Sequence, residues 1–377
     1  MRRTADAGPV LLAGAFGQRN PGDEALLTAF HRALPDMELI VASSDPAQTS
    51  WRHGLASIDS RSPVAVARTV NACRAVVFAG GTVFKALPPA SGRRSHELLR
   101  NGVALAGLAR VRGATVSLVG VGVGDLAPPG CRPLARQLAR TADLLILRDT
   151  ESASRLVDIG VAPPLRVGAD PAWTLLELAP DATPRTPQDR VAVVLSRWTT
   201  GPDTLAPLAA ALRPLIADGL RVELHPWQLG GPGVDDGDLT AELASLLAGD
   251  ATVVAPPADL LAAAERFRGA RLVVTARFHA LVAAAAVGTP SLALTAHEPK
   301  SAALAARLGQ PAVRVHADPQ RLTDQVRDAL TAAPASAAGV RAEVAAADEA
   351  FGLLRLVLTG GSVPAEEISG LRLEPVA

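Results

Sequence analysis

Residues 271–300 read RLVVTARFHALVAAAAVGTPSLALTAHEPK. The run predicts a short strand, a turn, an apolar helix, a second strand and a loop, because β-branched runs flank a longer Ala-rich segment. Arg277 and His279 fall at the junction between the first strand and the helix. A helix start offers free N–H groups and the positive end of the helix dipole, so the junction suits an anion that Arg277 would grip with its planar fork. Beside that anion, His279 is placed to donate a proton.

The same alternation of strand and helix continues in both directions along the chain. We expect strands at Val10–Phe16, Glu38–Ala42, Ala75–Ala79, Thr115–Val121, Leu144–Leu147, Leu165–Val167, Val191–Ser196, Arg221–His225, Thr252–Ala255, Leu272–Thr275, Ser291–Thr295 and Val313–His316. Such alternation is typical of parallel sheets with crossover helices. It predicts an α/β fold of two Rossmann-like domains facing across a cleft, a GT-B-like architecture, with ligands bound beyond the carboxyl ends of the strands.

A Pro-, Thr- and Asp-rich stretch without apolar periodicity divides the two series of strands. It reads APDATPRTPQD and predicts a linker over residues 179–189. Residues 1–178 then form the N-terminal domain and residues 190–335 the C-terminal domain. Residues 336–377 add a long helix near Val340–Leu358 and a tail.

Composition limits the classes of protein that the chain can belong to. Its 377 residues are 49% apolar, and 37 basic residues balance 37 acidic ones, so no global field draws the chain to nucleic acid or to an anionic membrane. All but two of the basic residues are arginines, the exceptions being Lys85 and Lys300, and tyrosine is absent. Cys73 and Cys131 show no metal-binding spacing and are expected to be buried free thiols. No apolar run approaches the roughly 20 residues that span a bilayer, and no signal-peptide cleavage region is evident, which predicts a cytoplasmic protein.

The first strand runs into GAFGQRNPGDEALL, a Gly-containing turn followed by a helix start. Asn20 can cap a helix that begins at Pro21, which puts Asp23 and Glu24 in the first turn, where the helix dipole favours carboxylates. Capping accounts for all of these residues. Alternatively the turn faces the ligand crevice, and its acidic residues contact a sugar hydroxyl.

Three further strand ends carry candidate binding residues. Gly80 and Gly81 end the third expected strand, where a ligand or a neighbouring backbone can come close. Arg148 ends the fifth, in LRDTES, either as a structural ion pair with Asp149 or as a grip for a carboxylate or phosphate. Lys300 follows the strand after the Ala-rich helix, again at a carboxyl end.

Six motifs in this order resemble the polysaccharide pyruvyl transferases, which include the cell-wall pyruvyltransferases. They are NPGDE (20–24), FAGGTVF (78–84), RDTES (148–152), ADPAW (169–173), ARFHALV (276–282) and HEPK (297–300), and they span nearly the whole chain. The sequence departs from the family pattern at Thr82, where a third glycine is common, and at His297 and Glu298, which replace Tyr-Asp. The second departure leaves the identity of the acceptor open.

The resemblance implies transfer of a pyruvyl group from phosphoenolpyruvate to a sugar, forming a cyclic ketal with release of phosphate. His279 would be the catalytic acid, and Asp23 or Glu24 would orient or deprotonate the acceptor hydroxyl. The residues that would bind substrate are Arg277, Lys300, Arg148, Asn20, Gly80 and Gly81. The N-terminal domain would then take the acceptor and the C-terminal domain phosphoenolpyruvate. The scheme needs no cofactor beyond this donor and no metal, and no cluster of metal ligands is visible in the sequence.

Two other functions fit the same residues. A GT-B-type glycosyltransferase would use Arg277 and His279 to grip the diphosphate of a nucleotide sugar, and a non-catalytic relative would only bind a glycan. The acceptor can be a wall polymer precursor, a lipid-linked disaccharide at the inner membrane face, a capsule unit or a natural-product sugar. The sequence shows no amphipathic basic helix that would indicate a membrane-bound acceptor. We expect no nucleic acid partner and no membrane span, and a homo-oligomer is compatible with the sequence.

Overall fold

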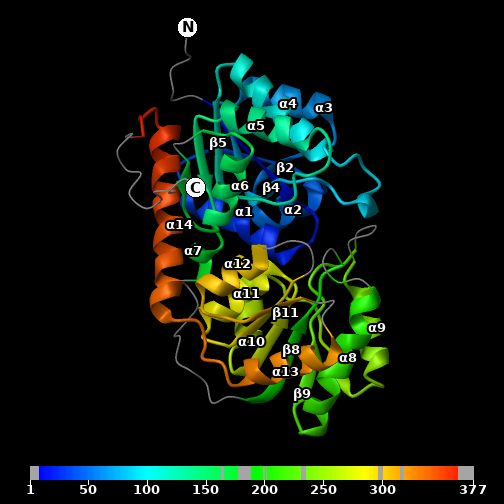
Figure 1. Ribbon diagram of the computed structural model, residues 1–377. Coiled ribbons are helices and arrows are strands. Elements are labelled where there is room, and N and C mark those ends of the chain that lie inside the picture. The colour runs from blue at the N-terminus through cyan, green and yellow to red at the C-terminus, as the bar shows by residue number, and fades with distance from the viewer. Residues whose placement is uncertain are drawn as a thin grey trace. The chain divides into compact units, whose positions relative to one another are not determined.

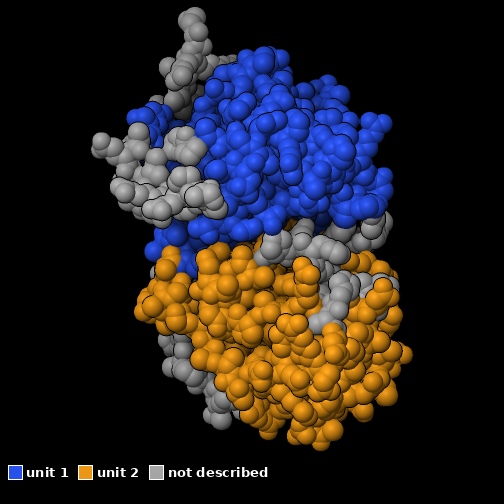
Figure 2. Space-filling view, viewed as in Figure 1, with its two compact units in different colours: residues 1–18, 26–174, 343–377 blue, residues 19–25, 175–342 orange. Residues whose placement is uncertain are grey.

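The computed structural model describes residues 8–162, 165–176, 188–197, 200, 202–230, 235–295, 300–314 and 318–363. The chain divides into two compact units (Figure 2). Unit 1 comprises residues 1–18, 26–174 and 343–377, and unit 2 comprises residues 19–25 and 175–342. Residues 19–25 thus cluster with unit 2 and residues 343–377 with unit 1. The expected domain ranges stay predictions.

Unit 1 contains a seven-stranded parallel sheet in the order β3-β2-β1-β4-β5-β6-β7. Its strands are β1 (Val10–Phe16), β2 (Leu39–Ser43), β3 (Ala56–Asp59), β4 (Ala75–Phe84), β5 (Thr115–Val123), β6 (Leu144–Leu147) and β7 (Arg166–Val167). Strand β4 runs beside both β1 and β5, and the register aligns Val76 with Leu11 on one side and with Val116 on the other. These three side chains are fully buried, as expected of central strands covered on both faces.

Helices connect these strands, and several begin with a capping carboxylate or hydroxyl. The helical elements between Pro21 and Leu176 are α1 (Pro21–Ala33), α2 (Pro46–His53), α3 (Pro63–Ala72), the 3-10 turn η1 (Pro89–Ser91), α4 (Glu97–Val111), α5 (Cys131–Thr141), α6 (Thr150–Asp158) and α7 (Trp173–Leu176). Asp45, Ser62 and Asp149 accept backbone N–H bonds at the starts of α2, α3 and α6. Such bonds satisfy donors that a helix start leaves without an internal partner.

Unit 2 contains a six-stranded parallel sheet in the order β10-β9-β8-β11-β12-β13. Its strands are β8 (Gln188–Val194), β9 (Arg221–Leu224), β10 (Ala251–Val253), β11 (Ala270–Thr275), β12 (Ser291–Thr295) and β13 (Ala312–Arg314). The connecting helices are α8 (Pro202–Ala217), α9 (Gly237–Leu246), α10 (Leu260–Phe267), α11 (Phe278–Ala286), α12 (Lys300–Arg307) and α13 (Pro319–Leu330), as Figure 1 shows. Helix α11 is buried along nearly its whole length, which accounts for its Ala- and Val-rich sequence.

The last helix, α14 (Ala337–Leu358), begins in unit 2 and continues into unit 1. In unit 1 the Phe351 ring meets Phe30 edge to face at a centroid distance of 5.0 Å, and Arg355 donates to the carbonyl of Ala33. The C-terminal part of α14 is therefore anchored to α1 by aromatic and polar contacts.

All twelve expected strands are present, and β3 is the one strand of the described chain that was not expected. Its four residues, ASID, are all partly or fully exposed and lie at the sheet edge, so they carry little hydrophobic pattern. The expected linker lies outside the described residues except for Gln188 and Asp189, which belong to β8. Cys73 and Cys131 are buried free thiols, as predicted, and burial raises the pKa of Cys73 to about 11. No helix of the described chain is both long and apolar enough to cross a bilayer.

Candidate functional site

The junction between β11 and α11 in unit 2 has the geometry that the sequence predicts. Arg277 is the residue just before α11, and its backbone N–H donates to the Thr275 hydroxyl at 2.9 Å. Strand β11 lies between β8 and β12, so the junction is at the carboxyl end of a central strand. Side chains that follow neighbouring strands are therefore within reach of Arg277.

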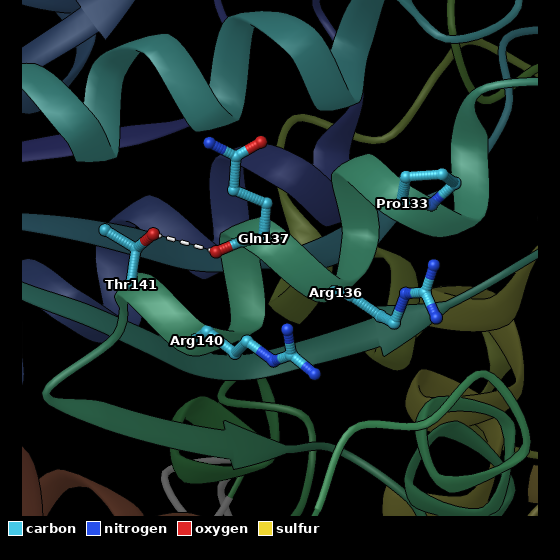
Figure 3. A pocket seen from close by; sticks show the side chains of 5 residues that line it. All are labelled: Pro133, Arg136, Gln137, Arg140 and Thr141. Carbon is cyan, nitrogen blue, oxygen red and sulfur yellow. Dashed lines mark hydrogen bonds between the residues drawn. The ribbon is translucent and has the colours of Figure 1, made fainter.

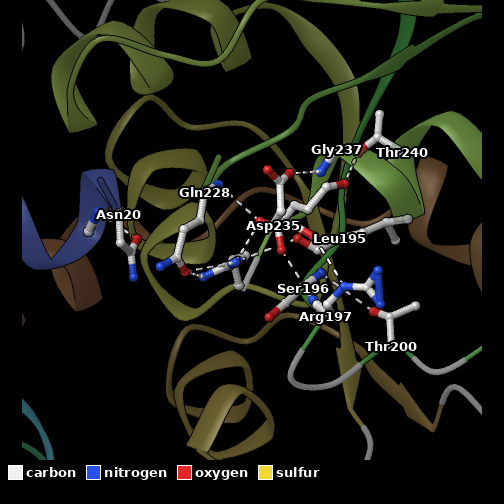
Figure 4. A network of polar contacts seen from close by, with 12 residues as sticks. Asn20, Leu195, Ser196, Arg197, Thr200, Gln228, Asp235, Gly237 and Thr240 are labelled. Carbon is white, nitrogen blue, oxygen red and sulfur yellow. Dashed lines mark hydrogen bonds and ion pairs between the residues drawn. The ribbon is translucent and has the colours of Figure 1, made fainter. Parts of the chain in front are cut away.

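The Arg277 side chain lies in a buried polar network. Figure 4 shows this network around Leu195 and Gln228, two residues whose oxygens accept from Arg277. Its guanidinium donates to Asp236 Oδ2 at 2.5 Å and to Gln228 Oε1 at 3.3 and 3.4 Å. Its Nε donates to the carbonyl of Leu195, just after β8, at 3.4 Å. Arg277 is 8% exposed and Asp236 fully buried, so this is a buried ion pair with supporting hydrogen bonds.

Asp236 is itself held by its neighbours. Its Oδ1 accepts from the backbone N–H of Arg197, and its Oδ2 accepts from that of Gln228. Three segments of unit 2 thus meet on one carboxylate. An arginine has five N–H donors, and four of those of Arg277 are used in the bonds described above. The anion grip of Arg277 stays a prediction.

His279 is the second residue of α11 and is half-buried. The start of α1 belongs to the same unit and comes close to it, because a Cβ added at Gly22 would lie 2.1 Å from His279 Nδ1. The ring of Phe278 meets the imidazole edge to face at 5.4 Å. Gly22 therefore leaves the room that the imidazole occupies, which is a physical reason for the glycine in the NPGDE motif.

The α1 start is a cap of the kind that the sequence predicts. Asn20 Oδ1 accepts from the Gly22 N–H at 3.1 Å, and its amide donates to Asp23 Oδ2 at 2.6 Å. Glu24 is 2% exposed. The capping interpretation accounts for Asn20 and Asp23, while the roles of Asp23 and Glu24 toward an acceptor stay predictions.

Lys300 is the first residue of α12, which follows β12, the neighbour of β11. It is half-buried. The sheet order therefore brings Lys300 and Arg277 to the carboxyl ends of adjacent strands. His297 and Glu298, the departures from the family pattern, lie outside the described residues.

Unit 1 has a second buried arginine at a strand end. Arg148 follows β6 and is 3% exposed, and its Nε donates to Asp149 Oδ2 at 3.1 Å. Asp170 Oδ2 lies 3.9 Å from the same guanidinium, and the Thr82 hydroxyl 3.4 Å away. The structural ion pair expected for Arg148 is therefore present, and its anion grip stays a prediction. Thr82, where the family often has glycine, supplies a hydrogen-bond acceptor to the arginine.

Asp149 both pairs with Arg148 and caps the next helix. Its Oδ1 accepts from the Ser152 N–H at 2.7 Å and so caps α6, as predicted. Burial raises the pKa of Asp149, but the Arg148 charge and the hydrogen bonds from Ser152 outweigh it, and the net pKa lies below the usual value. The carboxylate is thus held ionised beside the guanidinium.

Glycines let side chains lie against the ends of β4 and β5. A Cβ at Gly122 would be 2.6 Å from Arg148 Cζ, and one at Gly120 would be 2.3 Å from Pro171. Gly80 and Gly81 have φ values of +68° and +73°, and a Cβ at Gly80 would meet Leu26 at 2.9 Å. Gly80 thus leaves room for the Leu26 side chain, whereas a contact of Gly80 or Gly81 with ligand stays a prediction.

Asp236 and Gln228 are the site residues that the sequence did not reveal. Asp236 lies in VDDGDL, which reads as an exposed acidic turn before a helix, and Gln228 follows a strand without any motif. A hydrophilic turn gives no sign that one of its carboxylates is buried. The clue that was available is Arg277 itself, because a buried guanidinium needs a carboxylate partner. Among the described residues, no cluster of three or more His, Cys, Asp or Glu could hold a metal ion.

Two parallel α/β units with polar strand ends define the class of protein. Three solved structures share the fold: UDP-GlcNAc 2-epimerase from Methanocaldococcus jannaschii (11% identity, TM-score 0.62, 92% of this chain and 99% of that one), UDP-GlcNAc 2-epimerase from Neisseria meningitidis bound to UDP-GlcNAc (10%, 0.59, 94% and 100%) and Acinetobacter baumannii MurG (12%, 0.51, 92% and 99%). The architecture is therefore GT-B-like, as predicted.

The family model of the polysaccharide pyruvyl transferases matches residues 20–298. The chain belongs to this family and is a transferase of that kind, which confirms the resemblance carried by the six motifs. A search of the curated proteins finds no match.

Proposed function

We propose that the protein transfers the pyruvyl group of phosphoenolpyruvate to a sugar of a polysaccharide or glycan precursor, forming a cyclic ketal and releasing phosphate. Membership of the family supports the transferred group. The observation that carries the proposal is the position of Arg277 and His279 at the β11–α11 junction. There a guanidinium held by hydrogen bonds and an imidazole that can transfer a proton both lie at a helix start.

The reaction places definite demands on these residues. A proton is added to the methylene carbon of phosphoenolpyruvate, and the adjacent carbon then has the character of an oxocarbenium ion, which a sugar hydroxyl attacks. Phosphate leaves as the carbon–oxygen bond to it breaks, and a second hydroxyl closes the ketal. One hydroxyl proton restores the acid and the other leaves with phosphate, so atoms and charge balance. No cofactor and no metal takes part in this scheme.

His279 fits the role of the acid in this scheme. Gly22 and Phe278 confine its ring, so the imidazole is oriented before substrate arrives. The donor carries a carboxylate and a phosphate, which the guanidinium of Arg277, the ammonium of Lys300 and the positive end of the α11 dipole would bind. Because Asp236 neutralises Arg277, we assign most of the net positive charge to Lys300 and the helix start. We retain Arg148 as a predicted further contact, and Asp23 or Glu24 as the group that handles the acceptor hydroxyl.

The decisive experiment replaces the acid. We expect His279→Ala to fold with unchanged melting temperature and to lose phosphate release from phosphoenolpyruvate by a factor of roughly 100 to 10,000, the usual contribution of a general acid. His31→Ala, which removes an exposed imidazole from the last turn of α1, is the matched control and should keep full activity. Near-normal phosphate release from folded His279→Ala would remove His279 from the mechanism.

A thermal-shift comparison separates this function from nucleotide-sugar transfer. Some proteins of similar fold are solved with UDP or UDP-GlcNAc, but at 10–15% identity they speak for the fold alone. Stabilisation by phosphoenolpyruvate and not by UDP or GDP is the expected result, since a ligand raises the melting temperature only if it binds the native state. Stabilisation by a nucleotide diphosphate alone would favour a glycosyltransferase, and stabilisation by a glycan without turnover would favour a binding protein. A cytoplasmic location and a homo-oligomer stay predictions.

A further inference from the structure

Positive charge is concentrated in one segment of a chain whose total charge is zero. Residues 63–141 contain eleven basic residues and only two acidic ones, Glu97 and Asp125, whereas the whole chain has 37 of each. The remaining residues therefore carry an equal excess of negative charge. A separation of this size within one chain produces a local field even though the net charge is zero.

The segment forms one helical face of unit 1. It contains α3, α4 and α5, and α4 packs against both α3 and α5 (Figure 1). Right-handed crossovers put these helices on the same face of the sheet, because the strand order β3 to β4 to β5 to β6 advances in one direction. We call it the arginine face and define it by the exposed or half-exposed arginines Arg68, Arg93, Arg94, Arg100, Arg110, Arg112, Arg132, Arg136 and Arg140.

Helix α5 shows the arrangement most clearly. Arg132, Arg136 and Arg140 recur every fourth residue and so share one side of the helix, and α5 contains no acidic residue. Its opposite side is buried through Cys131, Ala135, Leu138 and Ala139. The helix is therefore amphipathic and basic, which corrects the expectation that the chain has no such helix. The sequence concealed it because the arginines alternate with core residues and form no basic run.

The arginines of α5 border a surface depression. It has a volume of about 470 Å³ and is lined by Pro133, Arg136, Gln137, Arg140 and Thr141 (Figure 3). The side chains of Arg136 and Arg140 leave the helix on the same side (Figure 3). Two guanidinium groups beside a hollow can bind one phosphate through paired hydrogen bonds.

Few carboxylates neutralise this face. Arg93 pairs with Glu97 at 2.7 Å, and Arg110 pairs with Asp143. Within the part of the chain that the structure describes, the three α5 arginines and Arg68 form no ion pair. Like charges four residues apart repel one another, so an external anion would stabilise the helix that carries them.

We infer that the arginine face binds the surface of an anionic lipid bilayer. Val64 of α3 and Val111 of α4 are 60% and 82% exposed on the same helices, and such side chains gain free energy when they enter the headgroup region. The Phe, Trp and Tyr residues of 63–141 are Phe78 and Phe84, both buried, so the one partly exposed ring of this segment on which a nucleobase could stack is the imidazole of His96. A lipid surface therefore matches the chemistry better than a nucleic acid. The inference goes beyond the proposed reaction and does not depend on it.

Co-sedimentation with vesicles tests the inference on the full chain. We expect binding to vesicles that contain phosphatidylglycerol in phosphatidylcholine, and none to pure phosphatidylcholine. The binding should weaken steeply as salt is added, because the attraction between exposed charges is screened. Equal binding to both kinds of vesicle would overturn the inference.

The triple variant Arg132→Gln/Arg136→Gln/Arg140→Gln locates the surface. Each basic residue near an anionic membrane contributes about fivefold to affinity, so we expect binding weaker on the order of 100-fold. The control Arg314→Gln/Arg321→Gln/Arg341→Gln removes the same charge from exposed positions outside the arginine face and should change affinity little. Equal weakening in both variants would mean a general charge effect and would contradict the assignment.

Two further measurements keep the test decisive. Arg132→Lys/Arg136→Lys/Arg140→Lys preserves the charge and should retain most of the binding. This variant keeps the inference testable if the melting curve shows that the glutamine variant is misfolded. A duplex DNA of matched charge is the competitor. If it binds the arginine face more tightly than the phosphatidylglycerol vesicles do in the same buffer, the partner is a nucleic acid and the lipid inference is wrong.

Discussion

Arg148 of unit 1 and Arg277 of unit 2 occupy the same kind of place in their sheets. Each follows a strand, β6 or β11, each precedes a helix, and each is less than a tenth exposed. Their partners differ. Arg148 is held by the next residue in the chain, Asp149, with Asp170 farther away, whereas Arg277 is held by Asp236, which lies 41 residues earlier.

The difference separates a local ion pair from a tertiary one. The Arg148–Asp149 pair is a product of the strand-to-helix turn and can form when that turn forms. The Arg277–Asp236 pair requires three segments of unit 2 to meet, so it depends on the completed fold. Both arginines also have tertiary contacts, but the nearest carboxylate is the neighbouring residue for Arg148 and a distant one for Arg277.

The largest effect is expected from removing the tertiary partner. Asp236→Ala leaves a guanidinium buried without a carboxylate and two backbone N–H groups without an acceptor, so we expect it to lower the free energy of unfolding by roughly 3–5 kcal/mol. Asp149→Ala should cost only about 1–2 kcal/mol, mainly through loss of the α6 cap, because Asp170 still faces Arg148. Urea denaturation of both variants measures the two costs. Equal losses of unfolding free energy in the two variants would show that the local and the tertiary ion pair contribute equally to stability.

A smaller effect is expected from filling the space beside each functional side chain. In Gly22→Ala the new methyl group meets the imidazole of His279 near its base, and in Gly122→Ala it meets the terminal guanidinium of Arg148. We expect each to cost about 1–3 kcal/mol of stability, as overpacking usually does, with Gly22→Ala also lowering phosphate release because it displaces the proposed acid. Gly107→Ala in α4, where no atom lies within 4 Å of the added Cβ, is the control. Full activity in Gly22→Ala would separate the glycine from the function of His279.

The smallest effect concerns a third buried arginine, Arg190, which lies in β8 and not at the carboxyl end of a strand. Its Nη1 is 3.0 Å from Glu223 Oε2. The imidazole of His225, whose Nε2 lies 3.5 Å from Glu223 Oε2, and the charge of Arg190 outweigh burial and lower the pKa of Glu223 to about 2. Because the folded value lies below the usual 4.5, Glu223 stabilises the fold above about pH 4.5 and loses this contribution as the pH falls toward 2.

The variant Glu223→Gln tests whether the stabilisation by Glu223 is lost as the pH falls. The difference in free energy of unfolding between the natural chain and the variant should be largest near neutral pH and should shrink steadily between about pH 4.5 and pH 2. Urea denaturation at several pH values across that range gives the difference directly. A gap that stays constant with pH would show that Glu223 contributes through packing and not through its charge.

The fold was predictable because its signal is local. Parallel strands such as β11 are short apolar runs, and α11 is an Ala-rich segment bounded by polar residues, so the order of elements follows from periodicity. Strand β3 escaped prediction because an exposed edge strand of four residues has no such contrast.

For the candidate site, the sequence predicts positions only where a charged or imidazole side chain follows a strand. Arg148, Arg277, His279 and Lys300 stand at strand ends, which is a place that the topology defines in advance. Asp236 and Gln228 could not be found in this way, because their contacts with Arg277 arise from tertiary packing across 41 and 49 residues. The basic side of α5 was hidden for a related reason, since its three arginines come together only when the segment is wound into a helix.

The scarcity of lysine gives the molecule an unusual chemical property. Lys85 belongs to unit 1 and Lys300 to unit 2, and the chain contains no other lysine side chain. Among side chains, an amine-reactive reagent would therefore modify one position in each unit. Because Lys300 belongs to the proposed donor site, phosphoenolpyruvate should protect it from such a reagent and leave Lys85 reactive.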